Sequence, residues 1–140
     1  MNSFAAKDAK DAKESMNEEY IGKQVVDARI KVHSVLGAGL LEGVYGACMA
    51  HELEKRGLQV KRQITLPIEY DDLKVDNAFR IDLLVDDKVV LELKAIDKLL
   101  PVHSAQLLSY LKLGKYKLGF LLNFNVVHMK DGIKRMVNNR

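Results

Sequence analysis

Residues 79–95 read FRIDLLVDDKVVLELKA, in which two apolar runs flank the polar residues 86–88. Such runs on both sides of a short polar group are typical of a β-hairpin. Successive residues of a strand point to opposite faces, so the length of the loop decides which side chains lie together. If all three polar residues form the loop, Asp87 or Lys88 must adopt the left-handed conformation, because the loop has no glycine.

The choice is between a loop of two residues and a loop of three. A two-residue loop would pair Val85 with Lys88 and would mix charged and aliphatic side chains on both faces. A three-residue loop pairs Val85 with Val89 and puts Asp82 opposite Glu92. Burial favours this second register, because one face is then wholly apolar. That face holds Ile81, Leu83, Val85, Val89, Leu91 and Leu93, and the other holds Arg80, Asp82, Leu84, Val90, Glu92 and Lys94.

The favoured register has a chemical consequence. Directly opposed residues have Cβ atoms about 5 Å apart, and two carboxylates at that distance repel each other. A divalent cation with oxygen ligands, such as Mg²⁺, would relieve the repulsion between Asp82 and Glu92. Lys94 projects from the same face, two residues after Glu92. The alternative is a solvated strand face on which Lys94 or Arg80 neutralises the acids without a metal.

The flanking segments alternate between the helical and the strand period, which predicts an α/β domain with helices on the faces of one mixed sheet. The expected helices begin after the cap Asn17, at Glu42 and at about His103, and the second is followed by Gly57 in a left-handed position. The expected elements are helices over about 18–36, 42–56 and 103–113, strands over 59–70, 79–85, 89–95 and 117–124, a turn region over 71–77, and a possible final hairpin of Val126–Met129 with Ile133–Val137. Pro67 indicates an edge or a bulge in the first strand.

Length and composition fit one domain of 140 residues, with 48% hydrophobic and 29% charged residues. Residues 6–13 read AKDAKDAK, with no large side chain to bury, so we expect a flexible tail over 1–15 and a single domain over 16–140. The lone Cys48 excludes an intrachain disulfide and a cysteine-based zinc cluster. No apolar run has the length of a membrane span. We therefore expect a reduced, soluble, cytoplasmic protein. The net charge of +3 permits a nucleic-acid partner without requiring one.

Two further pairs of polar residues are found on the expected helices, and the two members of each pair lie on the same face of their helix. Glu42 and Tyr45 are three residues apart at a helix start, and Gln106 and Tyr110 are four apart on a later helix, with His103 on the same side. Each pair has an ordinary explanation as well. A carboxylate at a helix start complements the helix dipole, and polar residues are common on a solvated helix face.

Together these motifs resemble a known family. Gly39, Glu42 and Tyr45 match the signature of the GxxExxY proteins. The resemblance extends over nearly the whole chain, from about residue 17 to residue 137, and is seen in the segments 45–53, 79–83, 92–95 and 103–110. That family is placed in the PD-(D/E)xK nuclease superfamily, which implies an αβββαβ core. The resemblance identifies Asp82, Glu92 and Lys94 with the superfamily's aspartate, second acid and lysine. It also identifies Glu42 with the acid on the preceding helix, and Gln106 with Tyr110 as a glutamine–tyrosine motif. Ile81 stands where the superfamily name has proline.

The resemblance implies Mg²⁺- or Mn²⁺-dependent hydrolysis of phosphodiester bonds in nucleic acid, with DNA favoured. Its expected metal ligands are Glu42, Asp82, Glu92 and the Leu93 carbonyl. Lys94 would orient water or stabilise negative charge, and Gln106 and Tyr110 would position substrate or Lys94. Tyr45, Arg80 and His103 are expected to contact substrate. No membrane partner is expected, and a homodimer stays open.

The competing hypothesis is a non-catalytic module that keeps the fold and binds nucleic acid or protein. Phosphates could then meet a surface of basic residues: Lys112, Lys115, Lys117, Lys130, Lys134, Arg135 and Arg140.

Overall fold

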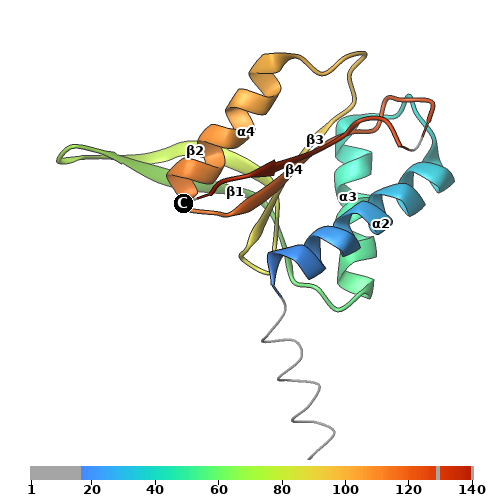
Figure 1. Cartoon of the computed structure of the whole chain (residues 1–140), viewed down its shortest axis with the longest axis horizontal. Coiled ribbons are helices and arrows are strands. Elements are labelled where there is room, and N and C mark those ends of the chain that lie inside the picture. The colour runs from blue at the N-terminus through green and yellow to red at the C-terminus, as the bar shows by residue number, and fades with distance from the viewer. Residues whose placement is uncertain (1–16, 129, 140) are drawn as a thin grey trace, which may run out of the picture.

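The computed structural model describes residues 17–128 and 130–139 (Figure 1). The helices are α2 (Glu18–Leu36), α3 (Glu42–Lys55) and α4 (Pro101–Gly114), and the strands are β1 (Val60–Tyr70), β2 (Leu73–Val85), β3 (Val89–Lys94), β4 (Leu118–Asn123) and β5 (Ile133–Val137). The Asn17 side chain accepts a hydrogen bond from Tyr20 N at 3.0 Å, which confirms the expected helix cap. The tail expected over residues 1–15 lies outside the described residues.

The five strands form one mixed sheet in the order β1-β2-β3-β4-β5. Strands β3 and β4 are parallel and α4 connects them, whereas the other neighbours are antiparallel. The run from α3 to β4 therefore has the αβββαβ order, with α2 added before it and β5 after it. This confirms the expected fold class.

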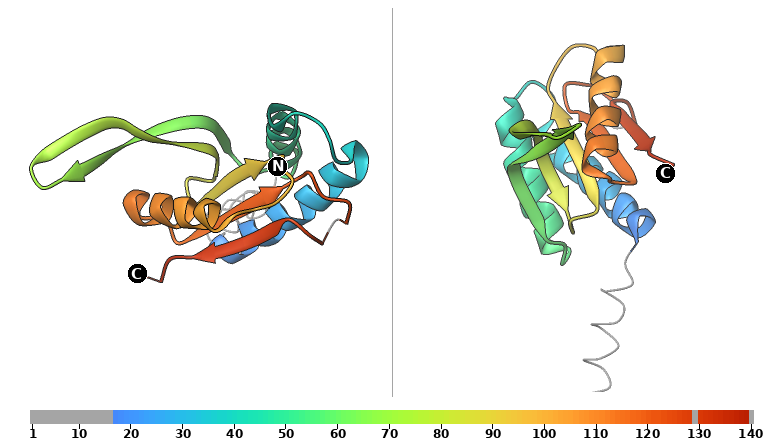
Figure 2. Two further views of the ribbon diagram at one scale, coloured as in Figure 1. Left: turned by 90° about the horizontal axis from the view of Figure 1, so that it is seen from above. Right: turned by 90° about the vertical axis from the view of Figure 1, so that its left-hand side faces the viewer.

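Helices cover both faces of the sheet (Figures 1 and 2). One apolar cluster joins α2 and α3 to side chains such as Leu83, Leu91 and Leu93. A second cluster joins Leu107 and Leu111 of α4 to the opposite face of the sheet, where it includes Leu84, Val90 and Leu121. One face of the hairpin was expected to mix charged and apolar residues. The apolar residues of that face are buried, because α4 packs on them.

The register of the β2–β3 hairpin is the one selected by burial. Val85 pairs with Val89, and Leu83 pairs with Leu91. Both Asp86 and Asp87 adopt positive φ, at 51° and 54°, so Asp87 is left-handed as predicted and Lys88 is not. The three-residue loop is therefore confirmed, with two aspartates sharing the turn.

One assignment of a side chain to a face was wrong. Ile81 packs in the α4-side cluster together with Phe79, whereas Leu83 packs in the cluster under α2 and α3. Strict alternation would put Ile81 and Leu83 on the same face. The alternation of β2 thus breaks at Asp82, beyond the last pair of the β2–β3 ladder. Across the β1–β2 ladder, Gln63 occupies the intervening position and has a φ of 53°.

Strands β1 and β2 continue past the end of β3 as a two-stranded arm (Figure 2). We define the outer part of this arm, residues 68–75, as the arm tip. Strand β2 begins at Leu73, because Tyr70 pairs with Leu73 around Asp71 and Asp72, so the expected turn region over 71–77 was too long. Residues 73–78 are all exposed and show no apolar alternation. The register shifts between Leu66 and Ile68, as Pro67 on this edge strand indicated.

The C-terminal hairpin differs from the expected one. Strand β5 pairs with β4, as in Leu118 with Val137, while residues 126–128 form no strand and Met129 lies outside the described residues. Arg29 of α2 anchors the loop between β4 and β5. Its Nη2 donates hydrogen bonds to the carbonyls of Asn123 and Asp131, both at 2.8 Å. The apolar residues at 126 and 127 made this part of the loop resemble a strand in the sequence, because the pattern of apolar residues does not show that Arg29 anchors the loop.

Candidate active site

Two carboxylates meet where β2 and β3 separate. Glu92 is buried, at 4% exposure, and Asp82 is half-buried. The two carboxyls are close enough for the charge of Asp82 to raise the pKa of Glu92. Asp82 Oδ2 also accepts a hydrogen bond from Leu93 N at 2.9 Å, so the side chain of Asp82 takes the place of a ladder partner for β3. The expected proximity of these two acids is therefore present.

The Leu93 carbonyl lies in the same gap. Phe124 N donates to Lys94 O at 2.9 Å, so the Lys94 carbonyl faces β4. Peptide groups alternate in direction along a strand, and the carbonyl before it therefore faces the β2 side. The β2–β3 ladder ends at Leu83 and Leu91, so this carbonyl is directed to the side on which Leu93 N bonds to Asp82.

The Glu92 carboxyl is in an unfavourable place for a charge. Burial is the largest cause that raises its pKa, and the neighbouring charge of Asp82 adds to it, so that the pKa of Glu92 rises to about 9. Lys94 acts in the opposite direction. Among the described residues, Glu92 Oε1 is buried and has no hydrogen-bond partner. Buried polar atoms normally have one, so this atom points to a missing ligand.

Three other side chains surround the pair. Half-buried Lys94 and exposed Arg80 supply positive charge. The Tyr110 ring of α4 stacks on Phe79, with centroids 4.9 Å apart. Burial raises the pKa of Tyr110, and the charges of Glu92 and Asp82 raise it further. The phenol hydroxyl therefore stays protonated and remains available as a donor near the acids.

Glu42 approaches the pair from the start of α3. It is exposed, and its pKa is raised first by partial burial and then by the charge of Asp82, while Lys94 and Arg80 lower it. A cavity of about 90 Å³ lies between Glu42 and Asp82; its lining also includes Gly43, Gly46, Arg62, Gln63, Leu83 and Leu93. The acid on the preceding helix is thus close to the strand acids, as the resemblance implies.

Tyr45 fixes the conformation of the loop that precedes Glu42. Its side chain is fully buried, and its ring stacks on Phe124 with centroids 4.4 Å apart. The hydroxyl donates to Gly37 O at 2.6 Å and accepts from Leu40 N at 3.1 Å. We call these two bonds the Tyr45 latch. The burial contradicts the expectation that Tyr45 contacts substrate; the residue instead ties the loop before Glu42 to the core.

The α4 residues separate into different roles. His103 Nδ1 accepts a hydrogen bond from Leu100 N at 2.9 Å, and His103 N donates to Leu100 O at 2.9 Å. This residue therefore caps the start of α4, and its expected contact with substrate stays a prediction. Gln106 is exposed one turn before Tyr110 on the same side of the helix. Its place in the site stays a prediction.

Arg62 and Gln63 were missed by sequence reasoning. Both line the cavity between Glu42 and Asp82. In the sequence they belong to Lys61-Arg62-Gln63, which is typical of an ordinary exposed strand segment. The signal that singles them out is structural, because Gln63 is left-handed inside a strand and neither residue belongs to a motif.

The donor set fits a divalent ion of the magnesium type. Mg²⁺ keeps several waters and needs only one or two carboxylates, and here two carboxylates and a backbone carbonyl face one gap. The unpartnered Glu92 Oε1 is the atom that such an ion would satisfy. Within the described part of the chain, no three His, Cys, Asp or Glu side chains are grouped closely enough to hold a metal. Glu42, Asp82 and Glu92 are therefore not grouped as three direct ligands in this structure, and a role of Glu42 as a metal ligand stays a prediction.

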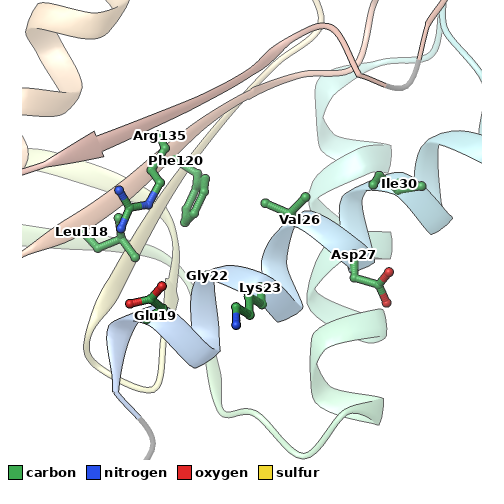
Figure 3. Close-up of a pocket in the computed structure, with 9 residues that line it drawn as sticks. All are labelled: Glu19, Gly22, Lys23, Val26, Asp27, Ile30, Leu118, Phe120 and Arg135. Carbon is green, nitrogen blue, oxygen red and sulfur yellow. The ribbon is translucent and has the colours of Figure 1, made fainter.

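A larger cavity lies elsewhere (Figure 3). It has a volume of about 480 Å³ and lies between α2 and the strands β4 and β5, where Val26, Phe120 and Arg135 are among its lining residues. One of its acids, Asp27, already pairs with Arg56 at 2.7 Å. None of its lining residues belongs to the acid pair or its surroundings, so size alone does not identify the site.

The model of the PD-(D/E)XK nuclease superfamily matches residues 19–136. The chain belongs to this superfamily. The matched span includes every residue of the candidate PD-(D/E)XK site, from Glu42 on α3 to Tyr110 on α4. No curated protein and no solved structure gives a match to the chain. Among the described helices, none is long and apolar enough to cross a membrane.

Proposed function

We propose that this PD-(D/E)XK protein is a divalent-metal-dependent nuclease that hydrolyses phosphodiester bonds, with DNA as the favoured substrate. The observation that carries the proposal is the buried Glu92 carboxyl beside Asp82, with one oxygen lacking any partner among the described residues. A buried carboxyl without a hydrogen-bond partner lowers the stability of the fold. Such a group is typical of a site that binds a cation.

Asp82, Glu92 and the Leu93 carbonyl would hold Mg²⁺ or Mn²⁺, and Glu42 would act from further away. When bound, such an ion polarises the phosphate and lowers the pKa of a coordinated water. Lys94, half-buried on the same strand as Glu92, would stabilise negative charge that develops on the phosphate. The protonated Tyr110 hydroxyl would donate a hydrogen bond and help to hold Lys94 or the substrate in place.

We also infer that the chain is a GxxExxY-type member of the superfamily. The three signature residues have separate physical tasks that support this. Gly39 has a φ of 95°, which other residues adopt only with strain. Glu42 carries charge to the cavity, and Tyr45 latches the loop. A cytoplasmic location and a possible homodimer remain part of the proposal; the lone Cys48 is compatible with a reducing compartment.

Cleavage of end-labelled oligonucleotides tests the proposal. The purified chain should cut with Mg²⁺ or Mn²⁺ and not after chelation, on a panel of single- and double-stranded DNA and RNA. Lys94→Ala should reduce kcat by two or more orders of magnitude, because it removes charge stabilisation from the transition state. Lys55→Ala is the matched control, since it deletes an exposed lysine at the end of α3 and should leave the rate unchanged.

Two outcomes would contradict the proposal. The first is no cleavage of any substrate with either metal. The second is equal cleavage by wild type and Lys94→Ala, which would assign the activity to a contaminant. Metal-independent binding of nucleic acid without cleavage would favour the non-catalytic module.

A further inference from the structure

We propose that Arg62 and Gln63 form a second phosphate subsite, which holds a phosphodiester next to the one that is cleaved. This inference rests on the proposed nuclease function. It assigns a task to two residues outside the acid–lysine set. The subsite lies on the opposite side of Asp82 from Tyr110, and it would fix how the nucleic-acid backbone enters the site.

The placement of Arg62 is set by the β1–β2 ladder. Arg62 pairs with Leu83, which packs in the cluster under α2 and α3, so the Arg62 side chain also leaves the sheet on that side. A Cβ added to Gly46 would lie 3.5 Å from Arg62 Nη2. The guanidinium therefore lies against the first turns of α3, in the cavity that it shares with Glu42 and Asp82.

The charge of Arg62 is not used within the protein. Among the described residues, its guanidinium has no ion-pair or hydrogen-bond partner. Its neighbour Lys61 pairs with Asp87 at 2.7 Å, and Arg56 binds both Asp27 and Glu52. Glu42, one of the two acids that line the cavity, is influenced by the positive charges of Lys94 and Arg80, which lower its pKa. An uncommitted guanidinium in a polar cavity matches a phosphate, whose oxygens it can bind in a bidentate way.

Gln63 adds a neutral donor and a strained backbone. Its φ of 53° is rare for a residue with a side chain and costs about 1 kcal/mol or more. It stands across the ladder from Asp82, where β2 loses its alternation, and it is one of the residues that line the same cavity. The amide NH₂ can donate to a phosphate oxygen without adding charge.

The ligand is a phosphodiester of the bound strand and not free phosphate. Arg62 and Gln63 line one cavity together with Asp82, a member of the acid pair. A strand whose scissile phosphate lies at Asp82 and Glu92 would therefore bring a neighbouring phosphate towards Arg62. One guanidinium and one amide hold a monoanionic diester, whereas a site for a free dianion normally uses more charge.

Fluorescence anisotropy with a labelled oligonucleotide tests the subsite in the full chain, with cleavage prevented by omission of Mg²⁺. Arg62→Ala should weaken binding by about tenfold and should lower the slope of log K against log salt by about 0.7 to 0.9, as expected for one lost phosphate contact. Lys61→Ala is the matched control: it deletes the same charge at the adjacent position, on the opposite face, and should change binding less than twofold.

Two more variants distinguish a side-chain contact from a purely structural role. Arg62→Lys keeps the charge and should recover part of the affinity. Gln63→Gly should weaken binding while leaving the melting temperature equal or higher, because it removes the donor and the strain together. In the cleavage assay, Arg62→Ala should raise KM about tenfold with little change in kcat, since it lies away from the reacting phosphate.

The outcomes separate this inference from the proposed function. Equal effects of Arg62→Ala and Lys61→Ala, or unchanged binding in both Arg62→Ala and Gln63→Gly, would overturn the subsite even if the wild type cleaves. A wild type that never cleaves, but binds through Arg62 with the stated salt slope, would overturn the nuclease function alone. Competition by inorganic phosphate tests whether the ligand is a free phosphate instead of a phosphodiester. If phosphate displaces the oligonucleotide more effectively than chloride at equal ionic strength, the assignment to a diester is wrong.

Discussion

The Glu92 carboxyl beside Asp82 keeps its proton at neutral pH in the metal-free protein. Burial and the neighbouring charge bring the pKa of Glu92 to about 9 in the folded state. In the unfolded chain the same group ionises at about 4.3. The unfolded chain therefore loses this proton as the pH rises through 4.3, while the native state keeps it until about pH 9. The contribution of Glu92 to the free energy of unfolding is greatest below pH 4.3 and falls across that window.

Glu92→Gln should consequently stabilise the metal-free protein at neutral pH. The amide keeps the shape and can donate to Asp82 without needing to stay protonated. We expect a gain of about 1 to 4 kcal/mol at pH 7, since each unit of pKa shift is worth about 1.4 kcal/mol, and almost none at pH 4. Chemical denaturation at the two pH values measures it.

The same variant should lose its response to Mn²⁺. Wild type should bind Mn²⁺ more tightly as the pH rises towards 9, because the ion displaces the proton. Calorimetric titration of both proteins provides the check. A destabilised Glu92→Gln at pH 7, or undiminished Mn²⁺ affinity in it, would show that Glu92 is an ordinary buried side chain.

The Tyr45 latch provides the second prediction at this scale. Tyr45→Phe keeps the stacking on Phe124 but removes the bonds to Gly37 O and Leu40 N. Two lost hydrogen bonds should lower the free energy of unfolding by about 1 to 2 kcal/mol, measured in urea. Cleavage should fall as well, because the loop before Glu42 is released. Tyr20→Phe, on an exposed tyrosine, is the control. If both substitutions have the same effect, the latch contributes nothing.

At single residues, the sequence could predict the acid pair because register and burial are linked. Only the three-residue loop gives a wholly apolar face, so the positions of Asp82 and Glu92 follow from their neighbours. The role of Tyr45 could not be predicted in this way. A tyrosine near a helix start is compatible with a ligand contact or with a core position, and only the partners of its hydroxyl distinguish the two. Arg62 is similar, since nothing in the sequence of its strand shows that its guanidinium has no partner among the described residues.

At the level of elements, the arm formed by β1 and β2 is the least supported part of the molecule. Near its base, Ile64, Leu66 and Phe79 pack with the α4-side cluster. At the arm tip, Tyr70 and Leu73 are 71% and 61% exposed, and each strand has only the other as neighbour. A two-stranded ribbon in water is only marginally stable.

Amides of the arm tip should therefore exchange with solvent much faster than those of β3 and β4. We expect local opening well below the global free energy of unfolding for residues 69–74, and exchange near the global limit for Leu91 and Leu121. Native-state hydrogen exchange followed by NMR measures both. Strong protection of the arm tip that weakens on dilution would contradict this and would indicate a second copy packed there.

The length of the arm was also the main error in the expected strands. Residues 73–78 are exposed on both faces, so they have neither the alternation nor the apolar content that identifies a strand. They are extended because the backbone of β1 pairs with them. Helix bounds were better predicted, since Asn17 and Gly57 mark their ends through local chemistry that does not depend on the rest of the fold.

For the whole molecule, the sheet is buried on both faces while its acids stay accessible from one gap. The break in alternation at Asp82 makes this possible, because it moves Ile81 under α4 and leaves Leu83 under α2 and α3. Sequence alone predicted the αβββαβ order, since element types depend on local periodicity. It did not predict this break, because an irregularity in a strand leaves no mark in the sequence. It changes only the face of the sheet to which the following side chains point.

The position of the acid pair within one hairpin has a consequence for the order of folding. Asp82 and Glu92 are ten residues apart in the chain, whereas Tyr110 must arrive with α4 and β4. Local contacts close sooner than distant ones, so the repulsion arises before the helix that shields it has docked. We expect refolding to be slower at pH 8 than at pH 5, and Glu92→Gln to remove most of that difference. Stopped-flow refolding measures both rates. A wild type that refolds equally fast at the two pH values would mean that this hairpin closes only after the rate-limiting step, so that these two acids are brought together last.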